Sequence, residues 1–446
     1  MSVTAITSKA RGLEELAGRE PVSDGDQPAW VAGMRRAALE WVADHGFPTL
    51  KDEDWKYTPV KTLLEVPFEL ASTSAGRVLS SAMIDELAGD LGGTRLVFVN
   101  GHLAAHLSSL TELLDGARVT SFASAFLDDA LLLEPVLAGT WPGYRHAFTA
   151  LNAALAEDGV LIQIQPDTTV SAPIQLVFVS DAGATPVMSC PLVVVLAGAR
   201  SRATIVETHV GFGGVYLTNA VTEIVLGDGA QIEHYKIQDE AETAFHFAAL
   251  HVLPGRDSSF STNGLALGAA IARHEVWVRL EAEGAEVSLN GLYLPTGKQH
   301  HDNPTFVEHI APHCTSRQLY KGVLSGHGRG VFNGQIVVGH EAFDADAHQV
   351  NKNLLLSDTA EVDTRPRLEI FTDDVKCTHG AAVGQLDEDA VFYLRSRGVP
   401  HQEARGVLTY AFAQEMLELI KVEPLRSHVE SKVTSRLGAG NAEARR

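Results

Sequence analysis

Residues 221–232 read Val-Thr-Glu-Ile-Val-Leu-Gly-Asp-Gly-Ala-Gln-Ile: an apolar strand, a tight turn, a small residue and the start of another strand. Short β-prone runs of this kind fill the chain from about residue 160 to 377, and no helical pattern of useful length interrupts them. A doubly wound sheet needs crossover helices between its parallel strands, so that fold is excluded. A large sandwich, a propeller or a β-helix remain. The glycine-rich turns, without a blade-length repeat, favour the β-helix. The pattern of strand, turn, small residue and new strand seen at 221–232 recurs loosely and at irregular spacing at 195–199, 280–287, 323–331 and 355–362.

Both flanks of this stretch have helical periodicity. Apolar residues from Trp30 to Val42 fall at helical spacing, and residues 147–157 predict a short helix. Asp387 is placed to cap a helix, Pro400 to begin the next, and Pro424 to begin a last one before a frayed tail. We therefore divide the chain into an N-terminal helical region (1–92), a mixed transition segment (93–159), a β-helix core (160–386) and a C-terminal helical region (387–446).

Composition excludes several classes of protein. The chain has 446 residues, of which 45% are hydrophobic, and its 35 Lys and Arg against 56 Asp and Glu give a net charge of −21. This acidic balance argues against a nucleic-acid binder, which needs a basic surface. Cys190, Cys314 and Cys377 are too few and too far apart for a disulfide framework. Without a signal-peptide pattern or an apolar run of roughly 20 residues, we expect a cytoplasmic protein that does not bind membranes.

Two groups of residues could carry metal chemistry. His300, His301, Asp302, His309 and His313 include enough ligand types for zinc or iron. However, adjacent residues of a strand face opposite ways, and 19 histidines produce such groups by chance. We interpret this group as a solvated loop, with a metal site and a partner contact as alternatives. A phosphate loop at 291–298 is excluded, because five residues separate its glycines and Gln follows the lysine.

The second group is Cys377-Thr378-His379. If residues 374–379 form a strand, Cys377 and His379 point to the same face. A thiolate beside an imidazole suits iron, zinc or iron–sulfur ligation, or a nucleophile and its base. A closed cluster site needs four ligands, so a second subunit would have to supply the others. The alternative is a buried cysteine beside a hydrogen-bonded histidine.

Five ordered segments form a specific pattern: Phe-Asn-Gly-Gln-Ile at 332–336, Gln-Val-Asn-Lys-Asn-Leu-Leu-Leu-Ser at 349–357, Pro-Arg-Leu-Glu-Ile at 366–370, Asp-Val-Lys-Cys-Thr-His-Gly-Ala at 374–381 and Phe-Tyr-Leu-Arg-Ser-Arg-Gly at 392–398. This pattern resembles the SufB/SufD family, the core subunits of the SUF iron–sulfur cluster assembly machine. Weaker similarity extends to Gly-Phe-Pro at 46–48, Glu-Asp-Trp-Lys-Tyr at 53–57, Leu-Asn-Ala-Ala at 151–154 and Asp-Gly at 158–159. Within the family the chain resembles the SufD branch, because Gly380 stands where the SufB branch carries Glu after the histidine.

The resemblance implies a mainly β fold, with a right-handed parallel β-helix core between N-terminal and C-terminal helical regions. It implies a non-catalytic scaffold that forms a heterodimer with SufB and binds two copies of the SufC ATPase. A transient Fe–S cluster would form at the SufB–SufD interface, with His379 as a ligand and Cys377 as a second candidate. A flavin on the assembled complex cannot be read from the sequence. Residues Phe392, Tyr393, Leu394, Val407, Leu408 and Phe412 are the candidate surface for docking the ATPase.

Two other functions stay open at this point. One is a SufB-like homodimeric scaffold, which would place two copies of His379 across a two-fold axis. The other is an enzyme acting on polysaccharides, since parallel β-helices also carry lyases and hydrolases. Glu341, Asp344 and Asp346 could then supply its carboxylates.

Overall fold

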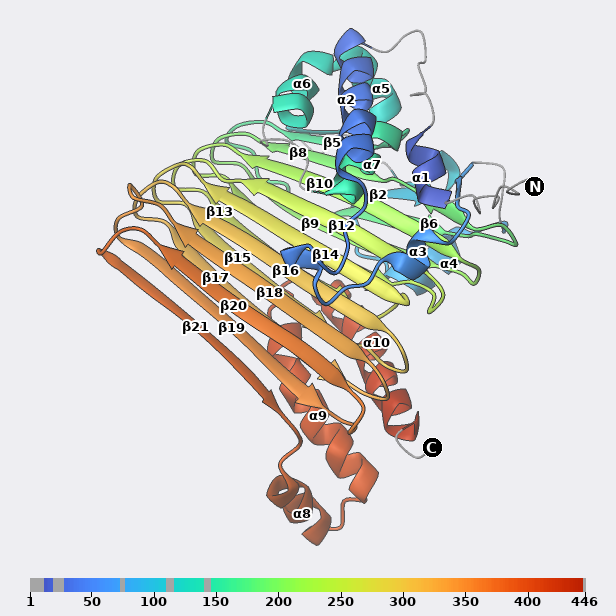
Figure 1. The fold of residues 1–446 in the computed structure, drawn as a ribbon, viewed down its shortest axis with the longest axis vertical. Helices are drawn as coiled ribbons and strands as arrows, with labels where there is room; N and C mark the ends of the chain where they lie inside the picture. The colour runs from blue at the N-terminus through green and yellow to red at the C-terminus, as the bar shows by residue number, and fades with distance from the viewer. Residues whose placement is uncertain (1–11, 19–27, 73–76, 110–115, 140–145, 444–446) are drawn as a thin grey trace, which may run out of the picture.

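The computed structural model describes residues 12–18, 28–72, 77–109, 116–139 and 146–443. Its centre is a parallel β-solenoid of about eight turns, and helices flank it at both ends (Figure 1). This confirms the mainly β fold and the helical flanks predicted from the sequence. Within the described residues, no helix is both long and apolar enough to cross a membrane.

Successive strands of the solenoid alternate between two facing sheets. Sheet A contains β4 (Ala117–Ser121), β5 (Gly159–Ile164), β8 (Leu192–Ala197), β10 (Tyr216–Leu226), β12 (Phe245–Leu253), β14 (Ile271–Leu280), β16 (His300–His309), β18 (Arg329–Val338) and β20 (Glu361–Ile370), with β1 (Glu69–Leu70) and β7 (Val187–Ser189) beside them. Sheet B contains β3 (His102–Leu103), β2 (Thr94–Val99), β6 (Ile174–Ser180), β9 (Arg202–Gly211), β11 (Gln231–Asp239), β13 (Ser259–Ala266), β15 (Glu286–Tyr293), β17 (Thr315–Leu324), β19 (Ala345–Leu355) and β21 (Val375–Gly384).

One turn of the solenoid is close to constant in length. In sheet B, Gln231 pairs with Ser259, Ser259 with Glu286, and Glu286 with Thr315, which gives steps of 28, 27 and 29 residues. The repeat is therefore more regular than the loose recurrence seen in the sequence. The turns share strand register and alternation of side chains rather than residue identity.

The space between the sheets is partly apolar and partly polar. Aliphatic side chains such as Val195, Ile224 and Val278 form the main core. Beside them lie buried polar side chains, among them Glu207, His234 and Gln349. Many of these polar side chains bond to one another across the strands, as buried polar groups must.

Most of the N-terminal helices cover the outer face of sheet A (Figure 1), whereas α4 (Ser81–Ala88) packs on β2, β6 and β9 of sheet B. Helix α2 (Ala29–His45) confirms the predicted stripe and ends at Gly46, whose φ of 70° suits glycine. The predicted second helix is α7 (Ala147–Leu155). The other elements of this region are α1 (Gly12–Ala17), η1 (Glu53–Trp55), α3 (Lys61–Leu64), α4 (Ser81–Ala88), η2 (Ala105–Leu107), α5 (Phe122–Asp128) and α6 (Ala130–Gly139).

The C-terminal helices pack on the outer face of sheet B. They are α8 (Glu388–Ser396), α9 (His401–Leu417) and α10 (Glu423–Glu443). Asp387 caps α8 as predicted, since its side chain accepts hydrogen bonds from the Asp389 and Ala390 amides. Pro400 is the residue before α9 rather than its first residue. The predicted frayed tail is helical as far as Glu443, and residues 444–446 lie outside the described residues.

The two ends of the solenoid differ. At the N-terminal end, β4 and β3 pair in the antiparallel sense with β5 and β2 and close the sheets. At the other end, β20 and β21 are the last strands of sheets A and B, and most of their residues are exposed or half-buried. Figure 1 shows this open edge along the lower left of the solenoid. The backbone groups of these edge strands are available to another chain.

Candidate functional site

The open end carries Cys377 and His379. Both lie on β21, two residues apart, and therefore on the same face of the strand, as predicted. Cys377 pairs in register with Ala347 and His379 with Gln349, and both of these β19 residues are fully buried between the sheets. The face shared by Cys377 and His379 is thus the continuation of the solenoid interior onto its exposed last turn.

The two side chains differ in exposure. His379 is exposed, whereas Cys377 is half-buried and packs against the main core. Burial raises the pKa of the Cys377 thiol, and a hydrogen bond from the Ala347 backbone partly opposes that effect. Cys190 and Cys314 are buried, and burial raises the pKa of Cys190 to about 12. Cys377 is therefore the most accessible of the three thiols, although it is not activated in the isolated chain.

Exposed apolar side chains border this pair. Ile370 and Phe371 stand at the end of β20, and Val383, which is 48% exposed, stands on β21. Within the described residues, no group of three or more His, Cys, Asp or Glu is arranged to hold a metal ion. The open end thus presents two ligand types, unpaired strand edges and apolar side chains on one surface.

Four of the five residues in the group at 300–313 lie on a strand, so the interpretation as a solvated loop was wrong for them, whereas His313 lies on an exposed turn. Residues 300–309 form β16, and His301 and His309 are buried inside the solenoid. His301 Nε2 lies 2.9 Å from the Gly268 carbonyl oxygen, and His309 Nε2 lies 2.8 Å from Ser316 Oγ. His300 faces the opposite way and contacts Thr58 on the outer face. Each of these histidines contacts a different partner through its Nε2 atom, so they are not gathered around one ion.

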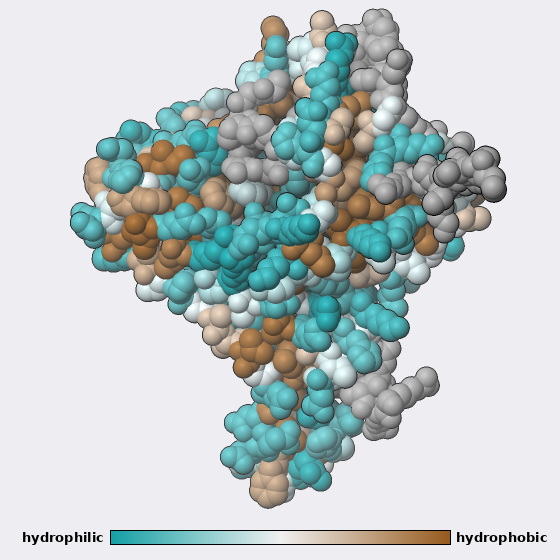
Figure 2. Space-filling model, in the orientation of Figure 1, coloured by the Kyte–Doolittle hydropathy of each residue, from teal (hydrophilic) through white to brown (hydrophobic). Residues whose placement is uncertain are grey.

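The candidate docking surface divides into two sets of side chains. Phe392, which is 69% exposed, Tyr393 and Val407 project outward from α8 and α9. Leu394, Leu408 and Phe412 are half-buried and pack against the C-terminal core. Lys321 of β17 donates to the Phe412 carbonyl at 2.8 Å. Figure 2 shows hydrophobic residues interspersed among hydrophilic ones on these projecting helices.

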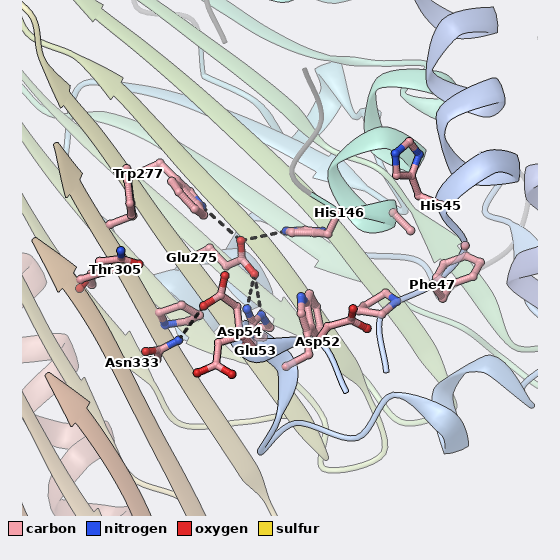
Figure 3. A pocket seen from close by; sticks show the side chains of 18 of the residues that line it. His45, Phe47, Asp52, Glu53, Asp54, His146, Glu275, Trp277, Thr305 and Asn333 are labelled. Carbon is pink, nitrogen blue, oxygen red and sulfur yellow. Dashed lines mark hydrogen bonds and ion pairs between the residues drawn. The ribbon is translucent and has the colours of Figure 1, made fainter. Parts of the chain in front are cut away.

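A cavity of about 410 Å³ lies on the outer face of sheet A (Figure 3). The segment 46–58, which we call the strap, crosses β14, β16, β18 and β20 there and forms one wall. Trp55 of the strap is buried and stacks on Phe148 and Phe247. The cavity beside this aromatic cluster was not predicted from the sequence.

The charges beside the cavity hold the strap. Arg273 lies over the Trp55 ring, with its guanidinium carbon 3.8 Å from the ring centroid, and bonds to the Asp54 carbonyl at 3.0 Å.

Arg273 also belongs to a network of buried charges, since it pairs with Asp302 and, at 2.6 Å, with Glu275. His146 lies 2.8 Å from the other Glu275 oxygen. Figure 3 shows Glu275 between His146 and Trp277. Burial would raise the pKa of Glu275, but Arg273 and His146 outweigh it and hold that pKa well below its usual range.

The strap also reaches the open end. Asp54 accepts hydrogen bonds from Asn333 at 3.2 Å and from Arg367 of β20 at 3.1 Å. Glu53 forms an ion pair with Arg365 on the same strand. Glu53 and Asp54 are exposed, and Arg365 and Arg367 are half-buried. These ion pairs position the N-terminal region against the last turn of the solenoid.

Comparisons with known proteins agree with the geometry. A family model described as "SUF system FeS cluster assembly, SufBD core domain" matches residues 178–412, and one described as "SufBD protein N-terminal region" matches 19–176. The chain is 33% identical over 407 residues to the iron-sulfur cluster assembly protein SufD of Escherichia coli, covering 90% of this chain and 92% of that protein. It is 26% identical over 417 residues to SufD of Bacillus subtilis, covering 91% and 94%. It is 27% identical over 437 residues to the chloroplastic protein ABCI7 of Arabidopsis thaliana, covering 96% and 90%.

Proposed function

Because this chain belongs to the SufBD family of the SUF iron–sulfur cluster assembly system, we propose that it is a non-catalytic scaffold subunit that builds clusters together with a SufB-type paralogue. The observation that supports this best is the open end of the solenoid. It combines unpaired edge strands, exposed apolar side chains and a Cys–His pair. A subunit that continued both sheets would cover these groups and supply the missing ligands.

In this proposal the cluster is cargo rather than a resident cofactor. His379, as neutral imidazole, ligates the transient cluster or lies next to a ligand, and Cys377 is a second candidate. Two protein ligands on this side leave room for two from the partner. The exposure of His379 supports the assignment, because a ligand to transient cargo must remain accessible until the partner closes over it.

We assign the docking of a SufC-type ATPase to the projecting helices α8 and α9. Phe392, Tyr393 and Val407 present an apolar surface there that the chain itself does not cover. These helices pack on sheet B through Val323 and Leu354, on the strands next to the open end. ATP-driven movement of the helices would thereby reach the cluster site.

The carboxylates considered for polysaccharide chemistry are poorly suited to it. Asp346 pairs with Arg317 at 2.7 Å, and this hydrogen bond lowers the pKa of Asp346. A general acid needs a raised pKa instead. Asp344 pairs with His313 at 3.0 Å on an exposed turn.

Native mass spectrometry of the chain, co-expressed with SufB-type and SufC-type partners and purified without oxygen, tests the proposal. We expect one copy of this chain, one SufB and two SufC. Val383→Asp on β21 should release SufB and retain SufC, because it buries a charge in the new interface. The matched control is Val78→Asp, since Val78 is 94% exposed and far from the open end in sequence. A chain that remains alone, or that forms only homodimers, would contradict the proposal.

A further inference from the structure

We propose that Gln349 is a positioning residue that accepts a hydrogen bond from the His379 imidazole and thereby directs the other ring nitrogen out of the open end. The consequence for cluster binding rests on the function proposed above, whereas the hydrogen bond itself does not. Histidines that bind metals usually donate their second N–H to a fixed acceptor, which selects the tautomer and orients the ring.

The register places the two side chains next to each other. Gln349 of β19 pairs with His379 of β21, and adjacent strands lie roughly 4.8 Å apart. Gln349 is 0% exposed and His379 is exposed, so the pair spans the boundary between the solenoid interior and its open end. Rotation of the His379 ring about χ2 can bring one of its N–H groups to the side-chain amide of Gln349.

A hydrogen bond to a side chain inside the solenoid fixes the carboxamide of Gln349. Its Nε2 donates to Gln318 Oε1 of β17 at 3.1 Å, and the same oxygen accepts from Thr305 Oγ1 at 2.7 Å. Gly334 of β18 leaves the space that this amide fills, because a Cβ there would lie 2.1 Å from Gln349 Nε2. Since Nε2 points back to β17, the oxygen is the atom left to meet β21.

That oxygen is unsatisfied. Gln349 Oε1 is buried and has no hydrogen-bond partner within the described residues. Leaving a buried acceptor unpaired costs about 1–3 kcal/mol, which favours any nearby donor. The His379 ring is the donor on the neighbouring strand at this register. Two other buried donors are also unpaired: the hydroxyl of Thr364 on β20, and Nε2 of Gln318, whose oxygen already bonds to Gln349.

The tautomer of His379 tests this proposal. It is measured by nitrogen–proton correlation NMR on the isolated full chain, with isotope-labelled histidine. The His379 signal is assigned as the one that disappears in His379→Gln. We expect one dominant tautomer in the natural chain and a mixture in Gln349→Met, which keeps the shape and removes the acceptor. Gln349→Glu, whose carboxyl retains an oxygen toward β21, should restore the single tautomer.

Two control variants test whether the change in the His379 tautomer is specific to Gln349. Gln335→Met, on the outer face of β18, and Thr364→Val should leave the tautomer of His379 unchanged. A tautomer mixture in the natural chain, or the same single tautomer in Gln349→Met, would overturn the proposal. So would a Thr364→Val variant that reproduces the effect of Gln349→Met.

A second measurement separates this inference from the proposed function. In the co-expressed complex, Gln349→Met should bind iron about 10-fold more weakly in a chelator competition, the lower limit for losing such an acceptor. If the tautomer responds but neither Gln349→Met nor His379→Ala changes the iron load, the positioning holds and the proposed function fails. If only His379→Ala lowers the iron load, the function holds, and the hydrogen bond from His379 to Gln349 does not contribute to binding the cluster.

Discussion

The buried His309 predicts a measurable dependence of stability on pH. Burial lowers the pKa of His309 from 6.5 to about 4, because the charged imidazolium is disfavoured inside the solenoid. The unfolded chain therefore binds the proton more readily than the folded chain. The stability that results is fully present above pH 6.5 and is lost as the pH falls toward 4.

The size of this effect follows from the shift. At this site the unfolded chain holds about half a proton more than the folded chain at pH 6.5 and nearly one more at pH 5. A difference of one proton is worth roughly 1.4 kcal/mol for each pH unit. Lowering the pH from 7 to 5 should thus cost about 2 kcal/mol through His309 alone. Glu207 and Glu240 do not contribute here, because their lowered pKa values confine their loss of stability to more acidic pH, below 4.5.

Urea unfolding of the natural chain and His309→Gln at pH 7 and pH 5, followed by tryptophan fluorescence, measures the difference. The variant should be less stable at pH 7, where the contact with Ser316 is lost, and should regain about 2 kcal/mol relative to the natural chain at pH 5. His327→Gln, an exposed replacement, is the control. An equal loss of stability in His309→Gln and the natural chain between the two pH values would show that burial does not lower the pKa of His309.

Three further outcomes follow from the same structure. Trp55→Ala should lower the free energy of unfolding by about 3–5 kcal/mol, because it empties a buried aromatic site. Thermal unfolding measures this loss, and a much smaller loss would show that the strap packs loosely on sheet A. Arg273→Met should cost about 3–5 kcal/mol by leaving the Glu275 carboxylate buried without its cation, and the double variant with Glu275→Met should recover much of that loss in urea unfolding. A thiol reagent should modify Cys377 in the folded chain, and faster at higher pH, while Cys190 reacts only on unfolding; equal rates would contradict the burial described here.

The sequence predicted the architecture because strand alternation and turn chemistry are local. The absence of helical periodicity between 160 and 377 excluded crossover helices, and α2 and α7 follow directly from apolar spacing. The regular turn length was hidden, since register is set by pairing between residues nearly 30 positions apart. The same-face geometry of Cys377 and His379 was predictable because it depends only on a two-residue separation.

What could not be predicted depends on distant contacts. His301 and His309 resemble solvent-facing residues in sequence, because a polar solenoid interior and a solvated surface give the same alternation. The cavity beneath the strap requires Arg273 to meet Asp54 across 219 positions. The division of the docking residues into exposed and half-buried sets likewise depends on how α8 and α9 pack on sheet B.

The role of the open end as a cluster site is best tested by the iron and sulfide content of the co-expressed complex carrying His379→Ala. We expect this chain still to assemble with its SufB-type and SufC-type partners, as shown by an unchanged native mass, while the cluster content of the complex falls well below that of the natural complex. An intact complex with an undiminished load of iron and sulfide would contradict the assignment of the open end of the solenoid as the cluster site.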